Sequence, residues 1–484
     1  MVNPSDTASP VNGRLEKTMK PSWAFAMALG SAVGWGAFIL PFDWGAEGGL
    51  AGTTIGFIIG GLIIAVIAVS YGNVIEKLPV AGGGVAFALS SLGRLHGFIA
   101  GWCLTLGYAG IVALNASAVT LVFRVTLPQL FMNYKLYSLA GWDIYLPEVI
   151  TASLFLIIFA VLNIRGIAFS GRFQFFAVLL LLLGVVFIFI ASALIFFTRG
   201  LELPAVFPEG VSPWVAVFTI VAFAPWAYVG FDSVPQLAGE FNFSPKKAFA
   251  LLMWGVFAAT AIYLVMMFAV TFAVGKNHDA YASDSWPTAT AIADLIGPIG
   301  LILMVVSASM GVLTGLNGFY VSSSRVLLTM GRAQMIPSAF ARLDPKFNSP
   351  KVSIISVAAL CLISPWFGRS ALSWIVDMTS VGISVAYFYT CYCAYAIGKK
   401  GRVFGMSSHD APRAGMKWFG LLGCIFSLGF LLLLLLPGSP GQLGKESLFA
   451  LLLWAILGMV FFLTRKKTYY ALSEEELLQA VYRQ

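Results

Sequence analysis

The sequence predicts an all-α membrane protein with twelve transmembrane helices. Of its 484 residues, 59% are hydrophobic and only 10% are charged, whereas a soluble domain carries about 25% charged residues. A helix that crosses a bilayer needs about 20 apolar residues, so twelve such helices account for roughly half of the chain. This composition disfavours a soluble enzyme, a disordered scaffold and a DNA-binding protein, because too few charges are present to cover a water-exposed surface.

Twelve apolar segments stand out with a window of about 19 residues. The last two are almost purely aliphatic at Leu431–Leu436 and Leu451–Val460, whereas the ninth is short and contains Pro365. The start of the third segment is left open, because it could begin earlier, near Val85. The predicted spans are 22–46, 50–72, 97–123, 147–164, 173–198, 213–238, 248–274, 298–322, 353–367, 371–397, 417–436 and 447–464.

Lysine and arginine are distributed unequally between the predicted loops. With the N-terminus inside, 23 of the 29 basic residues fall on the inner side, as the positive-inside rule requires. We therefore expect a multi-pass protein of the plasma (inner) membrane with both termini in the cytoplasm. The net charge of +8 belongs to these loops and does not indicate a nucleic-acid partner. Membrane lipid is an expected neighbour, and the sequence leaves an accessory subunit undecided.

The first and sixth spans contain residues that interrupt helices. Residues 30–41 read GSAVGWGAFILP and residues 224–235 read APWAYVGFDSVP. Glycine and proline weaken helices, and non-helical backbone survives in a bilayer only where it lines a cavity. Close helix packing, the other common reason for glycine, does not explain glycines that cluster in one turn before a proline. Two broken helices five spans apart are typical of a five-plus-five inverted repeat.

This repeat predicts the organisation of the chain. Both tails are polar, and Ser473 and Glu476 fit a capping box at the start of a short helix in the C-terminal one. The predicted parts are a cytoplasmic N-terminal tail at 1–21, the first repeat with spans 1–5 at 22–198, the second repeat with spans 6–10 at 199–397, spans 11 and 12 at 398–464, and a cytoplasmic C-terminal tail at 465–484.

The two breaks also predict a class of substrate. In such a repeat they meet near the midplane, where the N-terminal ends of half-helices attract an anion and the opposing carbonyl ends suit a cation. A zwitterion carries both charges. The backbone therefore predicts a small dipolar substrate without requiring any charged side chain.

Three motifs resemble those of the amino acid–polyamine–organocation (APC) transporters, which have the LeuT-type fold. They are GSAVGWGAF at 30–38, PVAGG at 79–83 and GFDSVPQLAGE at 230–240. The resemblance extends from about residue 20 to residue 465. It implies a permease, not an enzyme, that moves an amino acid by alternating access as a symporter or antiporter. A small biogenic amine or polyamine is the alternative substrate.

The resemblance also implies which residues bind the substrate. In that family the first-span glycine loop binds the substrate carboxylate through backbone N–H groups, and an aromatic residue near the sixth-span break closes over it. By resemblance, the first role belongs to Val33, Gly34, Trp35 and Gly36, and the second to Trp226.

The chain departs from the family pattern at three positions. Ala32 stands where glycine is usual, and Trp35 stands where a small residue is usual. A tryptophan there would fill much of an ordinary pocket, which indicates a small or unusual substrate. Leu181 occupies the fifth-span position at which some proton-coupled members carry a lysine, so the resemblance does not extend to coupling through that lysine.

Asp232 follows the sixth-span break directly. A carboxylate inside a membrane costs at least ~2.5 kcal/mol unless it is paired or neutral. We predict that Asp232 is either the partner of a substrate ammonium or a proton carrier. A third interpretation is an N-cap of the second half-helix, assisted by Ser233.

Aromatic and amide side chains near the breaks are further candidates. Aromatic faces attract cations within about 6 Å, although helix-facing aromatics also serve ordinary packing. Asn115 and Asn317 are intramembrane amides that could bond the substrate or a neighbouring helix, and Gly230 lies in the sixth-span break. The predicted aromatic box consists of Tyr108, Trp226, Tyr228, Phe231 and Phe319.

The sequence leaves the coupling ion open among H+, Na+ and exchange. Ser307, Ser309 and Thr314 resemble the eighth-span hydroxyls of LeuT-type sodium sites, which act together with first-span carbonyls. Such hydroxyls also bond back to their own helix. We expect no other cofactor. No G-x-x-x-x-G-K-[ST] loop is present in the sequence, so we do not expect ATP to drive transport directly.

Glu240 lies at the inner mouth of the sixth span. Its pairing with Arg14 or Lys17 would form a cytoplasmic gate, and a solvated loop is the alternative.

Two other functional classes, a channel and a membrane enzyme, compete with a transporter. A channel needs a continuous polar pore, and a membrane enzyme needs clustered titratable groups at one surface. The sequence contains few intramembrane polar residues and only three histidines, so both classes are less favoured.

Overall fold

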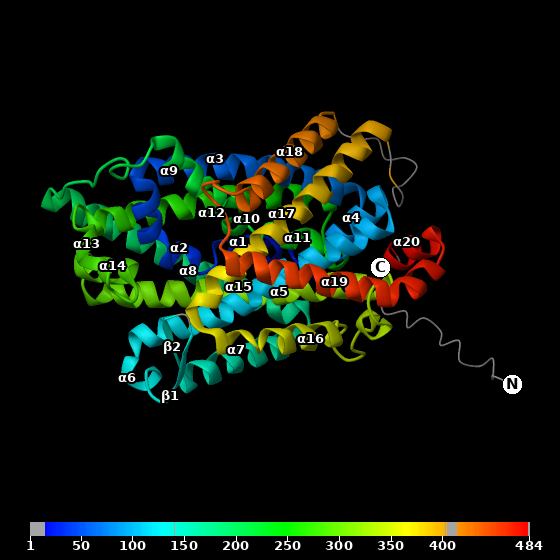
Figure 1. Ribbon diagram of the computed structural model, residues 1–484, viewed down its shortest axis with the longest axis horizontal. Coiled ribbons are helices and arrows are strands. Elements are labelled where there is room, and N and C mark those ends of the chain that lie inside the picture. Colours follow the sequence, from blue (N-terminus) through cyan, green and yellow to red (C-terminus); the bar gives the residue numbers. More distant parts are fainter. Residues whose placement is uncertain (1–14, 140, 402, 404–413, 483–484) are drawn as a thin grey trace.

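The computed structural model describes residues 15–139, 141–401, 403 and 414–482, and these residues are almost entirely helical (Figure 1). By length and composition, nine of the described helices can cross a membrane. This confirms the prediction of a helical, multi-pass membrane protein. The nine are α3 (Pro41–Lys77), α5 (Arg94–Thr126), α7 (Leu146–Ile164), α8 (Ile167–Arg199), α12 (Pro245–Val274), α15 (Pro298–Arg332), α17 (Gly368–Lys400), α18 (Met416–Leu435) and α19 (Lys445–Ala471).

Three of the predicted spans are assembled from shorter helices. The first consists of α1 (Pro21–Val33), α2 (Gly36–Ile39) and the start of α3. The sixth consists of α9 (Pro213–Ala222), α10 (Ala224–Ala227), α11 (Ser233–Gln236) and the 3-10 turn η1 (Ala238–Glu240). The ninth consists of α16 (Lys351–Cys361) and η3 (Ser364–Phe367).

Glycines mark the boundaries between neighbouring spans. Helix α3 continues through both the end of the first predicted span and the second, with a kink at Gly49, where φ is 62° and ψ is −174°. A left-handed φ strains any residue with a Cβ atom, which is why glycine stands there. Gly93, with φ of 87°, separates α4 (Gly83–Leu92) from α5. The third span therefore begins as a new helix at Arg94 and does not include the segment near Val85.

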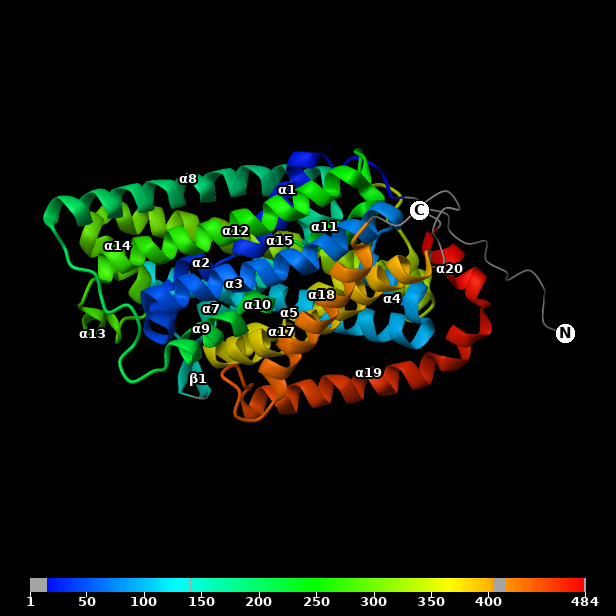
Figure 2. The ribbon, with the colours of Figure 1, turned by 90° about the horizontal axis from the view of Figure 1, so that it is seen from above.

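The connections contain elements that the sequence analysis did not predict. Strands β1 (Lys135–Leu139) and β2 (Trp142–Tyr145) form an antiparallel hairpin that follows α6 (Pro128–Phe131). Helices α13 (His278–Tyr281) and α14 (Pro287–Ile296) lie between α12 and α15, and η2 (Ser338–Ala341) follows α15. The hairpin and α13 lie at one end of the bundle, and α20 (Glu474–Tyr482) lies at the other (Figure 2).

The short C-terminal helix begins with the predicted capping box. The Ser473 N–H donates to Glu476 Oε2 at 2.8 Å, and the Glu476 N–H donates to Ser473 Oγ at 3.1 Å. These two bonds satisfy N-terminal donors of α20, and the hydrogen bonds that the Glu476 carboxyl accepts from Ser473 lower its pKa. Leu477 and Val481 are buried, so α20 is packed against the bundle.

The outer helices present apolar side chains outward. In Figure 2, α8 and α19 lie along opposite edges of the bundle. Phe187 on α8 is 60% exposed, and Phe449 on α19 is 69% exposed. Large apolar surfaces of this kind mark contact with a membrane. In contrast, α1, α10 and α11 are buried inside the bundle, with the exception of Pro21, Ser22 and Phe25 on α1.

Candidate functional site

The first helix break leaves backbone donors without acceptors. Helix α1 ends at Gly34, whose φ is 49° and whose N–H still donates to Gly30 O at 3.2 Å. Among the described residues, no backbone acceptor is found for the N–H groups of Trp35 and Gly36. Donors at the start of a half-helix attract anions. Of the four residues predicted to bind a carboxylate, Trp35 and Gly36 therefore hold free donors, whereas the donor of Gly34 is used within α1.

The second break packs directly against the first. Gly230, with φ of 129°, lies between α10 and α11. A Cβ atom on Gly230 would lie 2.4 Å from Ala32 N and 2.6 Å from Ser31 C. The two interruptions that the sequence predicted are thus real, and they are in contact at the centre of the molecule.

A cavity lies beside the two breaks. Its empty volume, including the part open to solvent, is about 270 Å³. The indole rings of Trp35 and Trp226 meet edge to face there with centroids 5.5 Å apart, and the Trp226 ring lies over Gly36, where a Cβ atom would come within 2.8 Å of it. The lining residues are Ser31, Ala32, Val33, Gly34, Trp35, Gly36, Ile111, Leu114, Asn115, Trp226, Ala227, Val229 and Phe319.

Among the residues that the structure describes, no charged side chain lines this cavity. Its polar side chains are Ser31 and Asn115, and both carry an oxygen, Ser31 Oγ and Asn115 Oδ1, that is buried without a partner in the described part of the chain. The Asn115 Nδ2 donor is used by Ile111 O at 2.8 Å, so Oδ1 is free to accept. The sequence predicts Asn115 as a candidate, because an amide in an apolar span is unusual, but it does not distinguish Ser31 from the rest of the glycine motif.

Asp232 does not line the cavity but closes the backbone turn behind it. This fully buried carboxylate accepts from Gly230 N at 2.8 Å through Oδ1 and from Tyr108 Oη at 2.6 Å through Oδ2. Gln236 Nε2 donates to Tyr108 Oη at 3.2 Å. Asp232 does occupy the N-cap position of α11, as the sequence predicted, but its side chain makes no capping bond there and Ser233 Oγ has no partner among the described residues.

The five predicted box aromatics do not surround one cavity. Only Trp226 and Phe319 line it. Tyr108 is turned to Asp232, and Tyr228 donates to Phe57 O at 2.9 Å on the side of α3. Phe231 instead packs with Tyr71 and Tyr387 at centroid distances of 5.6 Å each. Side chains around a broken turn point in several directions, so neighbours in sequence are separated in space.

Asn317 belongs to a buried amide chain rather than to the cavity. Its Nδ2 donates to Gln174 Oε1 at 2.8 Å, and its Oδ1 accepts from Asn163 Nδ2 at 3.1 Å. Gln174 Nε2 continues the chain to Ala26 O at 3.2 Å and to Thr314 O at 3.1 Å. These bonds tie α1, α7, α8 and α15 together behind the first break.

The three eighth-span hydroxyls do not converge. Thr314 Oγ1 donates to Gly30 O at 3.1 Å and so lies beside the first break. Ser307 is buried against Gly184 on α8, and its Oγ has no partner among the described residues. Ser307 and Thr314 are two helical turns apart, about 10 Å along the helix, and Ser309 is only partly buried.

The inner end of the sixth span carries a buried ion pair. Arg325 Nε donates to Glu240 Oε1 at 2.7 Å, and both side chains are 2% exposed. Arg325 was not one of the partners predicted for Glu240. Of those two, Lys17 is exposed, and Arg14 lies outside the described residues. The N-terminal segment still contacts Glu240, because Met19 N–H donates to Glu240 O at 2.9 Å.

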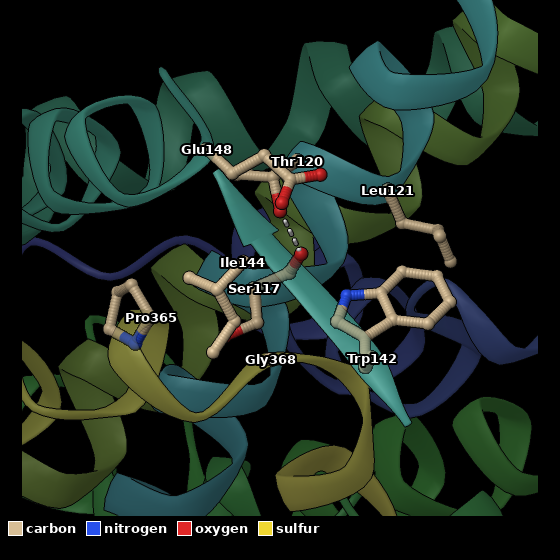
Figure 3. A pocket seen from close by; sticks show the side chains of 8 residues that line it. All are labelled: Ser117, Thr120, Leu121, Trp142, Ile144, Glu148, Pro365 and Gly368. Carbon is tan, nitrogen blue, oxygen red and sulfur yellow. Dashed lines mark hydrogen bonds between the residues drawn. The ribbon is translucent and has the colours of Figure 1, made fainter. Parts of the chain in front are cut away.

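A larger cavity of about 410 Å³ lies at the opposite end, beside the hairpin (Figure 3). None of the predicted binding residues lines it. Glu148 is paired with Arg124 at 3.4 Å, and the Arg124 guanidinium lies 4.1 Å from the ring centroid of Trp142. The charges of Glu148 and Arg124 therefore already neutralise each other. Together with Trp142, these two residues anchor the hairpin to α5 and α7.

The sequence model of a family described as amino acid permease matches residues 22–462. The branched-chain amino acid permease BcaP of Bacillus subtilis (strain 168) is 26% identical over 479 residues, which cover 91% of this chain and 91% of that protein.

More distant relatives differ in their named substrates. The serine/threonine exchanger SteT of Bacillus subtilis (strain 168) is 25% identical over 72% of this chain and 76% of its own length. The vacuolar cationic amino acid transporter 4 of Arabidopsis thaliana is 23% identical over 79% of this chain and 64% of its own length.

Proposed function

Because the chain belongs to the amino acid permease family of APC transporters, we propose that it is a secondary transporter that moves a small neutral amino acid across the membrane by alternating access. The observation that carries this proposal is the contact between two broken helices beside a cavity without charged side chains. Its family consists of transporters rather than enzymes.

The cavity favours an amino acid over an amine. The free N–H groups of Trp35 and Gly36 need an anionic acceptor, which an amino acid supplies through its carboxylate. Asn115 Oδ1 and Ser31 Oγ then accept from the ammonium. A biogenic amine or polyamine has no carboxylate and would leave the donors unsatisfied.

A small neutral side chain fits the remaining surface. Ile111, Leu114, Val229 and Phe319 are apolar, and the two indoles occupy the space that a large side chain would need. A cationic or anionic side chain would be buried there without a counter-charge, which is unfavourable. Two relatives also carry names with neutral substrates, branched-chain amino acids and serine or threonine.

For the topology, we propose twelve spans arranged as a five-plus-five inverted repeat. The nine long helices and the three composite spans supply this number, and the repeats are 22–198 and 199–397, followed by two spans at 398–464 and flanked by tails at 1–21 and 465–484. The end that carries α20 faces the cytoplasm of a plasma (inner) membrane. One repeat rocks against the other around the central cavity while Trp226 covers the substrate.

The coupling ion that we propose is the proton, carried by Asp232. This carboxylate is fully buried beside the sixth-span break, and its Oδ1 accepts a hydrogen bond from the Gly230 N–H. Sodium is less favoured, because the Thr314 hydroxyl bonds Gly30 O on α1, whereas the Ser307 side chain, two helical turns away, packs against Gly184 on α8.

A ligand screen tests the proposed substrate class directly. Thermal unfolding of the purified full-length protein is measured with a panel of amino acids and amines, with and without sodium. A ligand present at 100 times its Kd stabilises the folded state by about 2.7 kcal/mol, so neutral amino acids are expected to raise the Tm. Stabilisation by amines alone, or by amino acids only when sodium is present, would contradict the proposal or its coupling ion.

Replacement of Trp226 by alanine tests the lid. The variant loses the contact with Trp35 and uncovers Gly36, so initial uptake into proteoliposomes is expected to fall about tenfold, equivalent to about 1.4 kcal/mol. The matched control is Trp254→Ala, because Trp254 on α12 is 66% exposed on the outside of the bundle. Wild-type uptake by Trp226→Ala at equal protein amounts would count against the lid.

Asp232→Asn tests the proton carrier. The amide keeps the size of the side chain but does not titrate, so uptake is expected to lose its response to an imposed pH gradient. Tyr108→Phe is the control, because it removes the bond to Oδ2 and keeps the carboxyl group; this variant should retain the pH response. An identical uptake profile from acid to alkaline pH in wild type and Asp232→Asn would remove the proposed role.

A further inference from the structure

A second polar cleft lies at the end of the bundle that carries the N-terminal segment. Its empty volume, including the part open to solvent, is about 360 Å³. It is formed where the segment before α1, the turn between α7 and α8, η1, α15 and the loop at 347–348 meet. None of its lining residues lines the central cavity. The residues that matter below are Glu16, Arg165, Ile167, Ala168, Glu240 and Arg325.

One side of this cleft carries donors without acceptors. Ile167 and Ala168 begin the 33-residue helix α8, whose N-cap Gly166 supplies no side-chain bond. Within the described ranges, no protein acceptor is found for their N–H groups. Arg325 is 1% exposed and uses Nε and Nη1 for Glu240 and Ser324, and these are the bonds found for it in the described part of the chain. Together with the exposed Arg165, this side suits a carboxylate.

The other side carries acceptors. Glu240 is 1% exposed, and only its Oε1 is bonded to Arg325. Its Oε2 is buried without a partner among the described residues, an arrangement that stays unfavourable until a donor arrives. Glu16 lies exposed on the N-terminal segment. The charges of Glu16, Arg165, Glu240 and Arg325 sum to zero, which matches a ligand that carries both signs.

We propose that this cleft is a second amino acid site, which binds the α-carboxylate and the α-ammonium of a free amino acid and leaves its side chain in solvent. The inference rests on the proposed function for the class of ligand and for the assignment of this end to the cytoplasm. It differs from the central site in using ionised side chains, whereas the central cavity offers backbone groups and neutral oxygens.

Occupancy of the cleft would hold the inner mouth closed. Two backbone hydrogen bonds join Met19 to the inner end of the sixth span. The Met19 N–H donates to Glu240 O at 2.9 Å, and Met19 O accepts from Asn242 N at 3.1 Å. A ligand between Glu16, Glu240 and the start of α8 would tether the N-terminal segment and α8, on the side of the first repeat, to the sixth span of the second repeat. Free amino acid in the cytoplasm would in this way slow its own further uptake.

The test is equilibrium binding of radiolabelled L-alanine to the full-length protein in lipid nanodiscs. Two sites per chain are expected in the wild type. Arg165→Gln should weaken the second site at least tenfold and leave one. Ile167→Pro should do the same, because proline removes the N–H at the first helical position, where it is tolerated. Arg172→Gln is the control, an exposed arginine on the same helix that does not line the cleft, and it should keep two sites.

The outcomes separate this inference from the proposed function. One site in the wild type, unchanged in Arg165→Gln and lost in Gly36→Leu, would overturn the second site and leave the transporter intact. Binding that Gly36→Leu does not affect would count against the central site instead. Displacement of alanine from the second site by acetate at equal concentration would also overturn the inference, because it would show a site for simple anions.

Discussion

Replacement of Gly230 by alanine is expected to reduce transport about a hundredfold, equivalent to about 2.7 kcal/mol. The φ of 129° at this residue is a conformation that side chains rarely adopt, and the added methyl group would lie 2.4 Å from Ala32 N and 2.6 Å from Ser31 C. Strain of this kind costs about 1–3 kcal/mol. The obstructing atoms are backbone atoms of the first break, so no side chain can turn aside to relieve it.

The measurement is the initial uptake rate into proteoliposomes, normalised to the amount of folded protein. Gly429→Ala is the matched control, because a methyl group there would meet no atom within 4 Å and the backbone is helical. That variant should transport like the wild type. Full activity of Gly230→Ala would show that the contact between the two breaks is not needed for transport.

Replacement of Glu240 by alanine is expected to destabilise the protein by about 3–5 kcal/mol, because it leaves the buried guanidinium of Arg325 without a counter-charge. Both side chains of this pair are 2% exposed. The readout is thermal unfolding of the purified protein in detergent, where the Tm should fall on the order of 5 °C.

Two further variants show whether the charge is responsible. Glu202→Ala breaks the pair between Glu202 and Lys276, whose side chains are 73% and 63% exposed, and should leave the Tm almost unchanged, because water screens an exposed pair. The double variant Glu240→Ala with Arg325→Met removes both charges and should recover much of the lost stability. Equal Tm values for Glu240→Ala and Glu202→Ala would contradict a structural role of the buried pair.

Local chemistry explains why the two breaks could be located from the sequence. Glycine and proline interrupt a helix wherever they cluster, whatever surrounds them. Gly34 and Gly230 accordingly have positive φ angles, and the helix ends beside each of them. The kink at Gly49 has the same origin, although it falls inside a helix that continues on both sides.

Partner choice could not be predicted in the same way, because it depends on how helices pack. Glu240 was expected to pair with nearby basic residues of the N-terminal tail, yet its partner is Arg325, 85 residues away. Tyr108 was expected in an aromatic box, yet it donates to Asp232, 124 residues away. Contacts between residues so far apart in the sequence produce no local pattern from which they could be predicted.

What the amino-acid order determines alone is the membrane class, the approximate spans and the positions of the interruptions, since each depends on composition or backbone geometry within about twenty residues. Only the tertiary structure decided which oxygens and donors remain free. Asn115 lines the central cavity and its Oδ1 has no partner among the described residues, whereas the Asn317 amide is bonded to Gln174 and Asn163. Two buried amides with the same chemistry thus differ in role because the rotation of each helix about its axis is set by all of its neighbours together.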